Sequence, residues 1–135
     1  MEYISVKTPA EIKTFYEKTN SLHDGHVISV NYSNSGISRN SDGCLVDEPY
    51  KNELVIKVMV TSLWDRIVEL KFTGVLEYQL KEYYTSYIYS ADINVDDHGF
   101  VIWSDEPWKT CDPSKMSFVK AINLEWRILN YVNMN

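Results

Sequence analysis

Hydrophobic and polar positions alternate along most of this chain, and the alternation predicts a protein built mainly of strands. The clearest case is the segment 53–61. Its even-numbered positions are all aliphatic: Leu54, Ile56, Val58 and Val60. Because successive side chains of a strand point to opposite faces, this segment presents one apolar face to a core. The same pattern predicts further strands over 26–32, 66–74, 75–80, 87–95, 100–103 and 117–129.

One helix is expected near the N-terminus, beginning after Thr8. Threonine is a favourable N-cap, Pro9 suits the first helical position, and Glu11 completes a capping box. Apolar and small residues then recur at helical spacing, at Ile12, Phe15, Tyr16 and Thr19. This stripe predicts a helix of about three turns with one buried face, ending near Asn20.

The size of the predicted sheet constrains the architecture of the single domain that we expect over 1–135. Six or seven strands spaced about 4.8 Å apart make a sheet roughly 25–30 Å wide. One helix about 10 Å across cannot cover the apolar face of a flat sheet of that width. The sheet must therefore curl around the helix, dimerise, or be roofed by the tryptophan-rich loop. We expect an α+β fold, a strongly bent antiparallel sheet (half-barrel or roll) with the N-terminal helix packed on it.

The segment 33–52 interrupts the strand pattern and is rich in Ser, Asn, Gly and Asp. Unstructured loops of this length are uncommon in compact domains. Two interpretations remain open, a short strand near Gly43–Asp47 and a mobile functional loop.

Charge and composition exclude several classes of function. The 13 basic and 19 acidic residues give a net charge of −6, which disfavours binding to a nucleic-acid backbone. The start of the chain lacks the features of a signal peptide, and no apolar run approaches the roughly 20 residues of a membrane span. Cys44 and Cys111 stand far apart without a Cys-x-x-Cys motif, which favours two free thiols. We therefore expect a cytoplasmic protein that binds neither nucleic acid nor membrane.

The sequence His23-Asp24-Gly25-His26 is the most suggestive cluster for chemistry. Two imidazoles and a carboxylate are able to bind a metal or to form an acid/base pair. The spacing does not match a helical ligand pair, however, and no third ligand lies nearby in sequence. We favour a structural role, in which Asp24 caps the backbone of a helix-to-strand corner. No metal, other cofactor or catalytic residue is predicted.

Two tryptophans, Trp103 and Trp108, flank an acidic loop that contains Asp105 and Glu106. Aromatic and acidic residues on a loop that leaves a strand are typical of a recognition surface. The competing interpretation puts Trp103 in the core and Trp108 over the end of the sheet as a lid. Five tyrosines are expected in the core rather than on a stacking platform: Tyr78, Tyr83, Tyr84, Tyr87 and Tyr89.

Several short motifs along the chain form a recognisable set. They are Leu22-His23-Asp24, Val68–Val75, Ala91-Asp92-Ile93 with Gly99–Trp103, and Leu124-Glu125-Trp126-Arg127. Together they resemble a family of small bacterial proteins that share a His-Asp motif after the first helix and a terminal Leu-x-Trp-Arg. Leu22 stands where that family often has Phe. In size, acidity and lack of a catalytic signature, such proteins are similar to the immunity proteins of bacterial toxin systems, so the resemblance implies a protein partner.

The leading interpretation is a non-enzymatic cytoplasmic interaction protein, an immunity-type inhibitor that binds a protein partner. Its candidate binding residues are His23, Asp24, Trp103, Asp105, Glu106 and Trp108. The alternative is a small-ligand-binding domain with a pocket between the helix and the curved sheet. An enzyme that uses His23 and Asp24 ranks third, and a homodimer is one way of covering the sheet.

Overall fold

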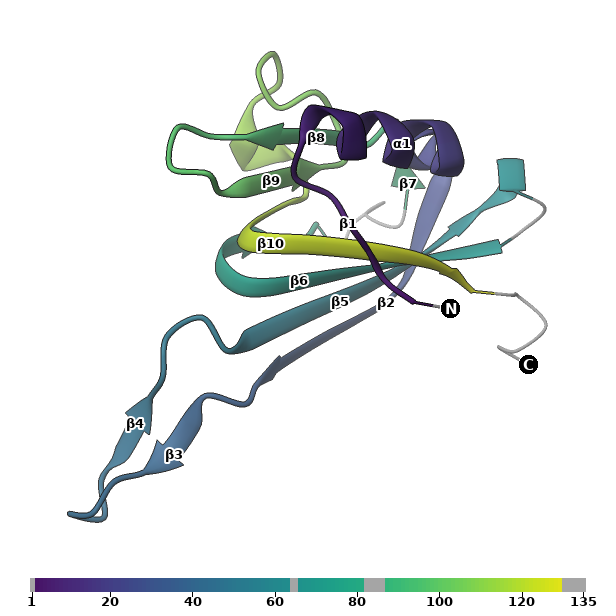
Figure 1. Cartoon of the computed structure of the whole chain (residues 1–135). Helices are drawn as coiled ribbons and strands as arrows, with labels where there is room; N and C mark the ends of the chain where they lie inside the picture. The colour runs from purple at the N-terminus through teal and green to yellow at the C-terminus, as the bar shows by residue number, and fades with distance from the viewer. Residues whose placement is uncertain (1, 64–65, 82–86, 130–135) are drawn as a thin grey trace.

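The computed structural model describes residues 2–63, 66–81 and 87–129. It contains one α-helix, α1 (Pro9–Thr19). The strands are β1 (Ile4–Ser5), β2 (Gly25–Asn34), β3 (Ile37–Arg39), β4 (Leu45–Asp47), β5 (Asn52–Val60), β6 (Arg66–Gln79), β7 (Tyr87–Ile88), β8 (Asp92–Val95), β9 (Val101–Ser104) and β10 (Phe118–Leu129). Figure 1 shows α1 lying across one side of a curled sheet, with the β3–β4 hairpin extending away from it.

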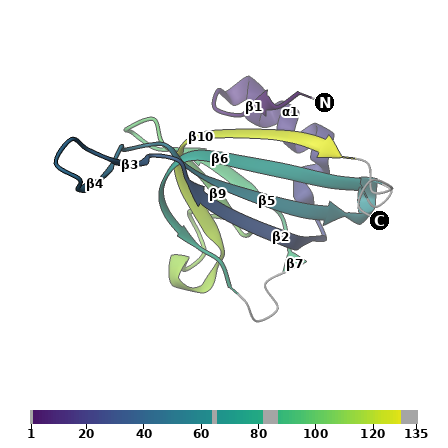
Figure 2. The same ribbon diagram turned by 90° about the horizontal axis from the view of Figure 1, so that it is seen from below.

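The main sheet is antiparallel and forms a half-barrel, which confirms the expected α+β fold. Its strand order is β7-β2-β5-β6-β10-β9-β8, and β1 pairs with the part of β10 that β9 leaves free. Laid flat, seven strands would separate the two end strands by about 29 Å. Only residues 89–91 join β7 to β8, and so short a connection spans roughly 15 Å at most. The sheet therefore has to curl (Figure 2), and residues 89–91 connect the two ends of its strand order.

This connection corrects one prediction. The alternation over 87–95 predicted one long strand, whereas the structure has β7 and β8 at opposite ends of the sheet order. The break falls at Tyr89–Ala91, where the Ala91 N–H donates to the Ser21 carbonyl at 2.7 Å instead of to a neighbouring strand. A local alternation cannot show that the partner strand changes halfway along a segment.

The core forms where the inner face of the three central strands meets α1. Leu54, Phe72 and Leu124 stand opposite one another on β5, β6 and β10 and are fully or almost fully buried. The next row is Ile56, Leu70 and Trp126. Phe15 of α1 packs edge-on against Trp126, with ring centroids 5.6 Å apart. The four aliphatic positions predicted for 53–61 are all fully buried.

The helix begins and ends as its sequence predicts. The Thr8 side chain accepts from the Glu11 N–H at 3.2 Å, and the Glu11 carboxylate accepts from the Thr8 N–H at 2.9 Å. These reciprocal bonds form the capping box that the sequence predicted. At the other end Asn20 adopts a left-handed conformation and closes the helix by donating to the Tyr16 carbonyl.

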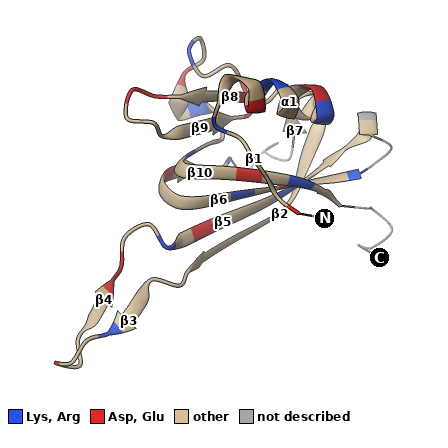
Figure 3. Ribbon diagram, viewed as in Figure 1, with Lys and Arg blue, Asp and Glu red and all other residues tan. Residues whose placement is uncertain are grey.

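Charged residues of opposite sign stand next to each other across the central strands of the sheet (Figure 3). Lys57, Glu69 and Arg127 stand in one row on β5, β6 and β10. The Glu69 carboxylate is only 7% exposed; it binds the Arg127 guanidinium and accepts from the Tyr3 hydroxyl at 2.8 Å. Burial raises the pKa of Glu69, but the hydrogen bonds from Arg127 and Tyr3 outweigh it and hold that pKa below its usual range.

Two strand predictions also need correction. The segments 66–74 and 75–80 form the single strand β6, because Gly74 continues the chain with a φ of +69° instead of ending it. In β2, Ile28, Val30 and Tyr32 were expected to form a half-buried face, and all three are exposed. A bulge between Val27 and Ser29 shifts the register of β2, which lies near one end of the sheet order.

Candidate functional site

The corner between α1 and β2 is the candidate site that the sequence singled out. Its backbone is unusual, because Asn20, Ser21, Leu22 and Asp24 all have φ between +53° and +57°. Residues other than glycine adopt this region at a cost, and such conformations gather at functional sites and tight turns. Gly25 follows, and a Cβ there would lie 2.8 Å from the Leu22 carbonyl oxygen. Only glycine therefore fits as the chain enters β2.

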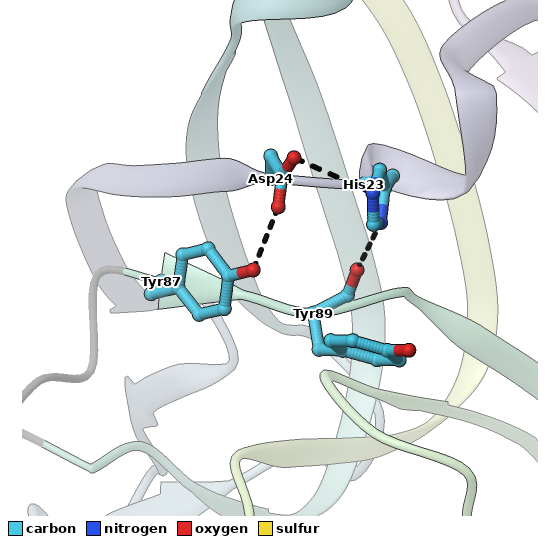
Figure 4. A network of polar contacts seen from close by, with 4 residues as sticks. All are labelled: His23, Asp24, Tyr87 and Tyr89. Atoms are coloured by element: carbon cyan, nitrogen blue, oxygen red, sulfur yellow. Dashed lines mark hydrogen bonds and ion pairs between the residues drawn. The ribbon is translucent and has the colours of Figure 1, made fainter.

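At this corner, His23 and Asp24 meet two tyrosines from β7 and the segment after it (Figure 4). The His23 Nδ1 lies 2.6 Å from the Tyr89 carbonyl oxygen, and the two rings pack edge-on. The His23 Nε2 lies 3.4 Å from Asp24 Oδ2. The Tyr87 hydroxyl donates to Asp24 Oδ1 at 2.6 Å, and this bond raises the pKa of Tyr87. The cluster thus fastens the helix-to-strand corner to the end strand β7.

The contacts of the His23 imidazole bear on whether it can act as a general acid or base. A carbonyl oxygen only accepts, so Nδ1 carries the hydrogen and donates to Tyr89. The other nitrogen, Nε2, faces the Asp24 carboxylate. A carboxylate also only accepts, so Nε2 bonds to Asp24 only when this nitrogen carries a hydrogen as well. Both ring nitrogens thus face groups of the chain itself. The contacts favour a positional role for His23 and Asp24 over general acid/base catalysis.

The structural role itself differs from the predicted one in its details. We expected the Asp24 carboxylate to cap backbone amides, whereas the contacts found for it are the Tyr87 hydroxyl and the His23 ring. Asp24 therefore joins the corner to another strand and is more than a local turn residue.

The histidines do not converge on a common point. The His26 ring packs edge-on against Tyr87, 5.6 Å between centroids, while His23 packs against Tyr89. Within the described ranges, no group of three or more His, Cys, Asp and Glu side chains is placed to hold a metal ion. Cys44 and Cys111 are both free thiols, as the sequence predicted.

The loop that follows β9 is not the exposed aromatic and acidic surface that the sequence also allowed. Trp103 is fully buried and packs against Phe72 in the core. Asp105 is 8% exposed; its carboxylate accepts from the Ser117 N–H, and burial raises its pKa. The surface interpretation is therefore wrong for these two residues.

Trp108 and Glu106 are half-buried, and Trp108 takes the position of the lid. Its ring packs on Phe118, 5.1 Å between centroids, and its backbone N–H donates to Asp92 at 2.9 Å. The Glu106 carbonyl accepts from the Ser104 hydroxyl at 2.7 Å. Of the six residues predicted to bind a partner, only His23 and Asp24 are exposed and in contact with each other.

Tyrosines that the sequence analysis assigned to the core are instead on the surface. Tyr78, Tyr87 and Tyr89 are exposed. Tyr78 stacks on Tyr32 of β2, with centroids 5.9 Å apart. Tyr83 and Tyr84 lie outside the described residues. Alternation alone misassigned these residues because tyrosine suits both a core and a partly wet surface.

The arm, which we define as residues 35–51, contains β3 and β4, so the short strand expected near Gly43–Asp47 is present as β4 (Leu45–Asp47), whereas β3 and its pairing with β4 were not predicted. In Figures 1 and 2 it extends beyond the half-barrel as a two-stranded ribbon. Four of its large apolar side chains are exposed: Ile37, Leu45, Val46 and Tyr50. Leu45 is 67% exposed, more than any other large apolar residue described. The length and polar composition of the segment left a short strand and a functional loop as alternatives, and neither signal indicated that the segment extends beyond the half-barrel.

The edge of β2 continues this accessible surface. β7 pairs with β2 only at Gly25 and His26. Beyond His26, no other strand among the residues described pairs with that edge of β2. The exposed side chains of Ile28, Val30 and Tyr32 lie along this stretch, next to the arm.

None of the helices described has the length and apolar character that crossing a membrane requires. Comparisons of the chain with protein-family models, with curated proteins and with solved structures find no match.

Proposed function

We propose that this chain is a non-enzymatic protein-interaction protein of the cytoplasm, an immunity-type inhibitor that binds its partner through the arm. The observation that carries the proposal is the exposure of apolar side chains along the arm. A two-stranded hairpin by itself is marginally stable in water. A partner that covered Ile37, Leu45 and Val46 would remove this apolar surface from water and stabilise the arm.

The base of the arm is ordered before any partner binds. The Glu48 N–H donates to the Gly36 carbonyl at 2.8 Å, and the Gly36 N–H donates to the Asn34 side chain at 2.8 Å. A Cβ on Gly36 would lie 2.5 Å from the Glu48 carbonyl oxygen, so the two strands approach closely there. A preorganised arm loses less conformational entropy on binding than a disordered loop would.

The charge of the chain indicates the kind of partner. The net charge of −6 favours association with a basic protein surface, since opposite fields speed encounter and select partners. Beside its apolar residues the arm carries three acidic residues, Asp42, Asp47 and Glu48, against two basic ones, Arg39 and Lys51. A toxin enzyme with a basic active-site surface combines both properties, an apolar patch and positive charge.

Site-specific photo-crosslinking in the source cell tests this proposal. A photoreactive phenylalanine analogue replaces Leu45 on the arm or, as the matched control, the exposed Lys18 on α1. We expect a single adduct with a second protein from Leu45 and none from Lys18. The double variant Ile37→Asp with Val46→Asp should abolish that adduct. The proposal is wrong if Leu45 gives no adduct, or if its adduct has twice the mass of the chain, which would make the arm a homodimer contact.

A cleft between α1 and β8 favours a second candidate function, the binding of a small ligand. This cleft supports the alternative interpretation of the sequence, a ligand pocket between the helix and the curved sheet. The cleft and the arm are separate surfaces with no residue in common, so one chain is able to use both.

A further inference from the structure

The cleft between α1 and β8 has a volume of about 450 Å³, within the range that holds a small organic ligand. Ile12 and Tyr16 line it from the helix, and Ile93 and Val95 line it from the strand. The Tyr16 hydroxyl is already engaged, because it accepts from the Ile93 N–H at 2.8 Å. The surface left for a ligand is therefore mainly apolar.

Two lysines, Lys7 and Lys13, stand at this apolar surface. Lys7 is half-buried and donates to the Ile122 carbonyl at 3.0 Å. No carboxylate among the described residues forms an ion pair with it. Lys13 pairs with Glu17 at 3.9 Å in a highly exposed position, where an ion pair contributes little. Both ammonium groups retain the capacity to bind an anion.

Three other carboxylates near the cleft, in the sequence or on the strand, are bound elsewhere. Glu11 accepts from the backbone of Thr8 in the capping box. Asp92 accepts from the Trp108 N–H at 2.9 Å and from the side chain of Asn94. Asp96 pairs with Lys120 and accepts from two backbone amides of its own turn. The two lysines at the cleft thus have fewer polar partners within the chain than these carboxylates have.

We propose that the cleft binds a small amphipathic carboxylate. Its apolar body would lie over Ile12, Ile93 and Val95, and its carboxylate would accept from Lys7 and Lys13. Charge-assisted hydrogen bonds of this kind are about twice as strong as neutral ones. This inference rests on the second candidate function, ligand binding, and is independent of the arm.

The test is a titration of the full chain with three probes that share a ten-carbon tail. Two-dimensional amide NMR spectra monitor the binding of each probe. The probes are decanoate, decanol and decyltrimethylammonium, each kept below the concentration at which it forms micelles. We expect saturable shifts with decanoate at the amides of residues 7–16 and 92–95. At the usual binding free energy per ligand atom, the Kd should be about 1 mM or tighter. Decanol should bind at least about tenfold more weakly, because it gives up the charge-assisted contacts with both lysines.

Two variants test the two halves of the site. Lys7→Met should weaken the binding of decanoate about tenfold and leave that of decanol unchanged. Lys18→Met, on α1 but outside the cleft, should change neither. Val95→Asp places a carboxylate at the exposed end of β8. It should reverse the charge preference of the cleft, so that decanoate binds more weakly and decyltrimethylammonium binds more tightly. Val30→Asp is its control, an exposed valine on β2.

Each other outcome overturns the inference. If decanoate produces no saturable shifts, the cleft does not bind this class of ligand. If decanol binds as tightly as decanoate, or Lys7→Met behaves as Lys18→Met does, the lysines are not part of the site. The dispersion of each spectrum reports folding, so an unfolded variant is recognised at once and Val95→Asp provides the second test. The arm-directed crosslinking does not depend on any of these results.

Discussion

Asp24 shows how a single residue at the helix-to-strand corner combines a demanding backbone with a side-chain contact. Its φ of +57° lies in the left-handed region, which aspartate and asparagine tolerate better than most residues do. Its carboxylate accepts from the Tyr87 hydroxyl and lies beside the His23 ring. The backbone conformation is a local property, whereas the side-chain contact links the corner to β7. Different substitutions of Asp24 therefore separate the contribution of the backbone from that of the side chain.

Asp24→Ala should lower the free energy of unfolding by about 1 kcal/mol, chiefly because alanine resists a left-handed backbone. Asp24→Gly relieves the backbone but removes the side-chain contact, and it should be more stable than the alanine variant. Asp24→Asn keeps both the conformation and an acceptor and should be close to the parent. Urea unfolding of the parent and the three variants gives the order of their free energies of unfolding. An alanine variant as stable as the parent would show that the corner is not under this conformational constraint.

Tyr3 provides a pH dependence whose sign follows from its environment. Burial, followed by the hydrogen bond and the charge of Glu69, raises the pKa of Tyr3 from 10.0 to about 12. The folded chain therefore holds this proton more tightly than the unfolded chain does. The resulting stability is complete below pH 10 and is lost as the pH rises toward 12.

Tyr3→Phe lacks this titration, so the stability advantage of the parent over the variant should shrink between pH 10 and pH 12. The urea midpoints of both proteins, recorded across that pH range, measure the difference in stability. The titrations of the other tyrosines and of the lysines are common to both proteins and cancel in the comparison. A difference that stays constant with pH would mean that Tyr3 titrates alike in the folded and unfolded chains.

Among the elements, the arm is distinguished by its separation from the core. The turn between β3 and β4 is closed locally, because the Asn40 side chain accepts from the Asp42 and Cys44 amides and Gly43 has a φ of +81°. The hairpin between β8 and β9 repeats this design, with Asp96 accepting from two amides and Gly99 at a φ of +81°. The same type of turn thus closes the β8–β9 hairpin of the main sheet and the β3–β4 hairpin of the arm.

Replacing residues 35–51 with Asn-Gly should join β2 directly to β5 and leave the core intact. The paired residues Asn34 and Asn52 stand opposite each other, as a two-residue hairpin requires. Because the apolar residues of the arm are exposed, we expect the free energy of unfolding to change by about 0.5 kcal/mol or less. Urea unfolding measures it, and the same deletion should abolish the proposed partner contact. A loss of several kcal/mol would instead make the arm part of the folding unit.

At the scale of the whole molecule, both ends of the described chain contribute to one core. Val6 and Phe15 from the N-terminal region are buried with Leu124 and Trp126 of β10. Leu22 and Ile88 are buried in the same cluster, close to residues 89–91, which connect the two ends of the strand order. A core assembled from such distant segments should form or melt as a unit.

We therefore expect urea unfolding to give coincident transitions by tryptophan fluorescence, which reports the core, and by far-ultraviolet circular dichroism, which reports the strands. Leu22→Ala should shift both curves equally, by about 2–5 kcal/mol, as truncations of fully buried leucines do. Its control, Leu45→Ala on the exposed arm, should shift neither. Two separate transitions would divide the chain into more than one folding unit.

Much of the fold could be predicted from the sequence because its signals are local. The capping box of Thr8 and Glu11 and the aliphatic face of 53–61 depend only on neighbouring residues, and the structure has both. The half-barrel followed from a local pattern combined with geometry, since one helix cannot cover a flat sheet of that width. These features were determined by the sequence itself.

Tertiary structure alone decided which faces are covered. Trp103 and Tyr89 both occur in alternating segments, yet one is fully buried and the other exposed. The difference arises from strand order: Trp103 lies in β9, opposite Val119 and Ile93, while Tyr89 crosses between two ends of the sheet. A period of two tells which residues share a face of a strand, but only the pairing of distant strands determines whether that face meets a core or water.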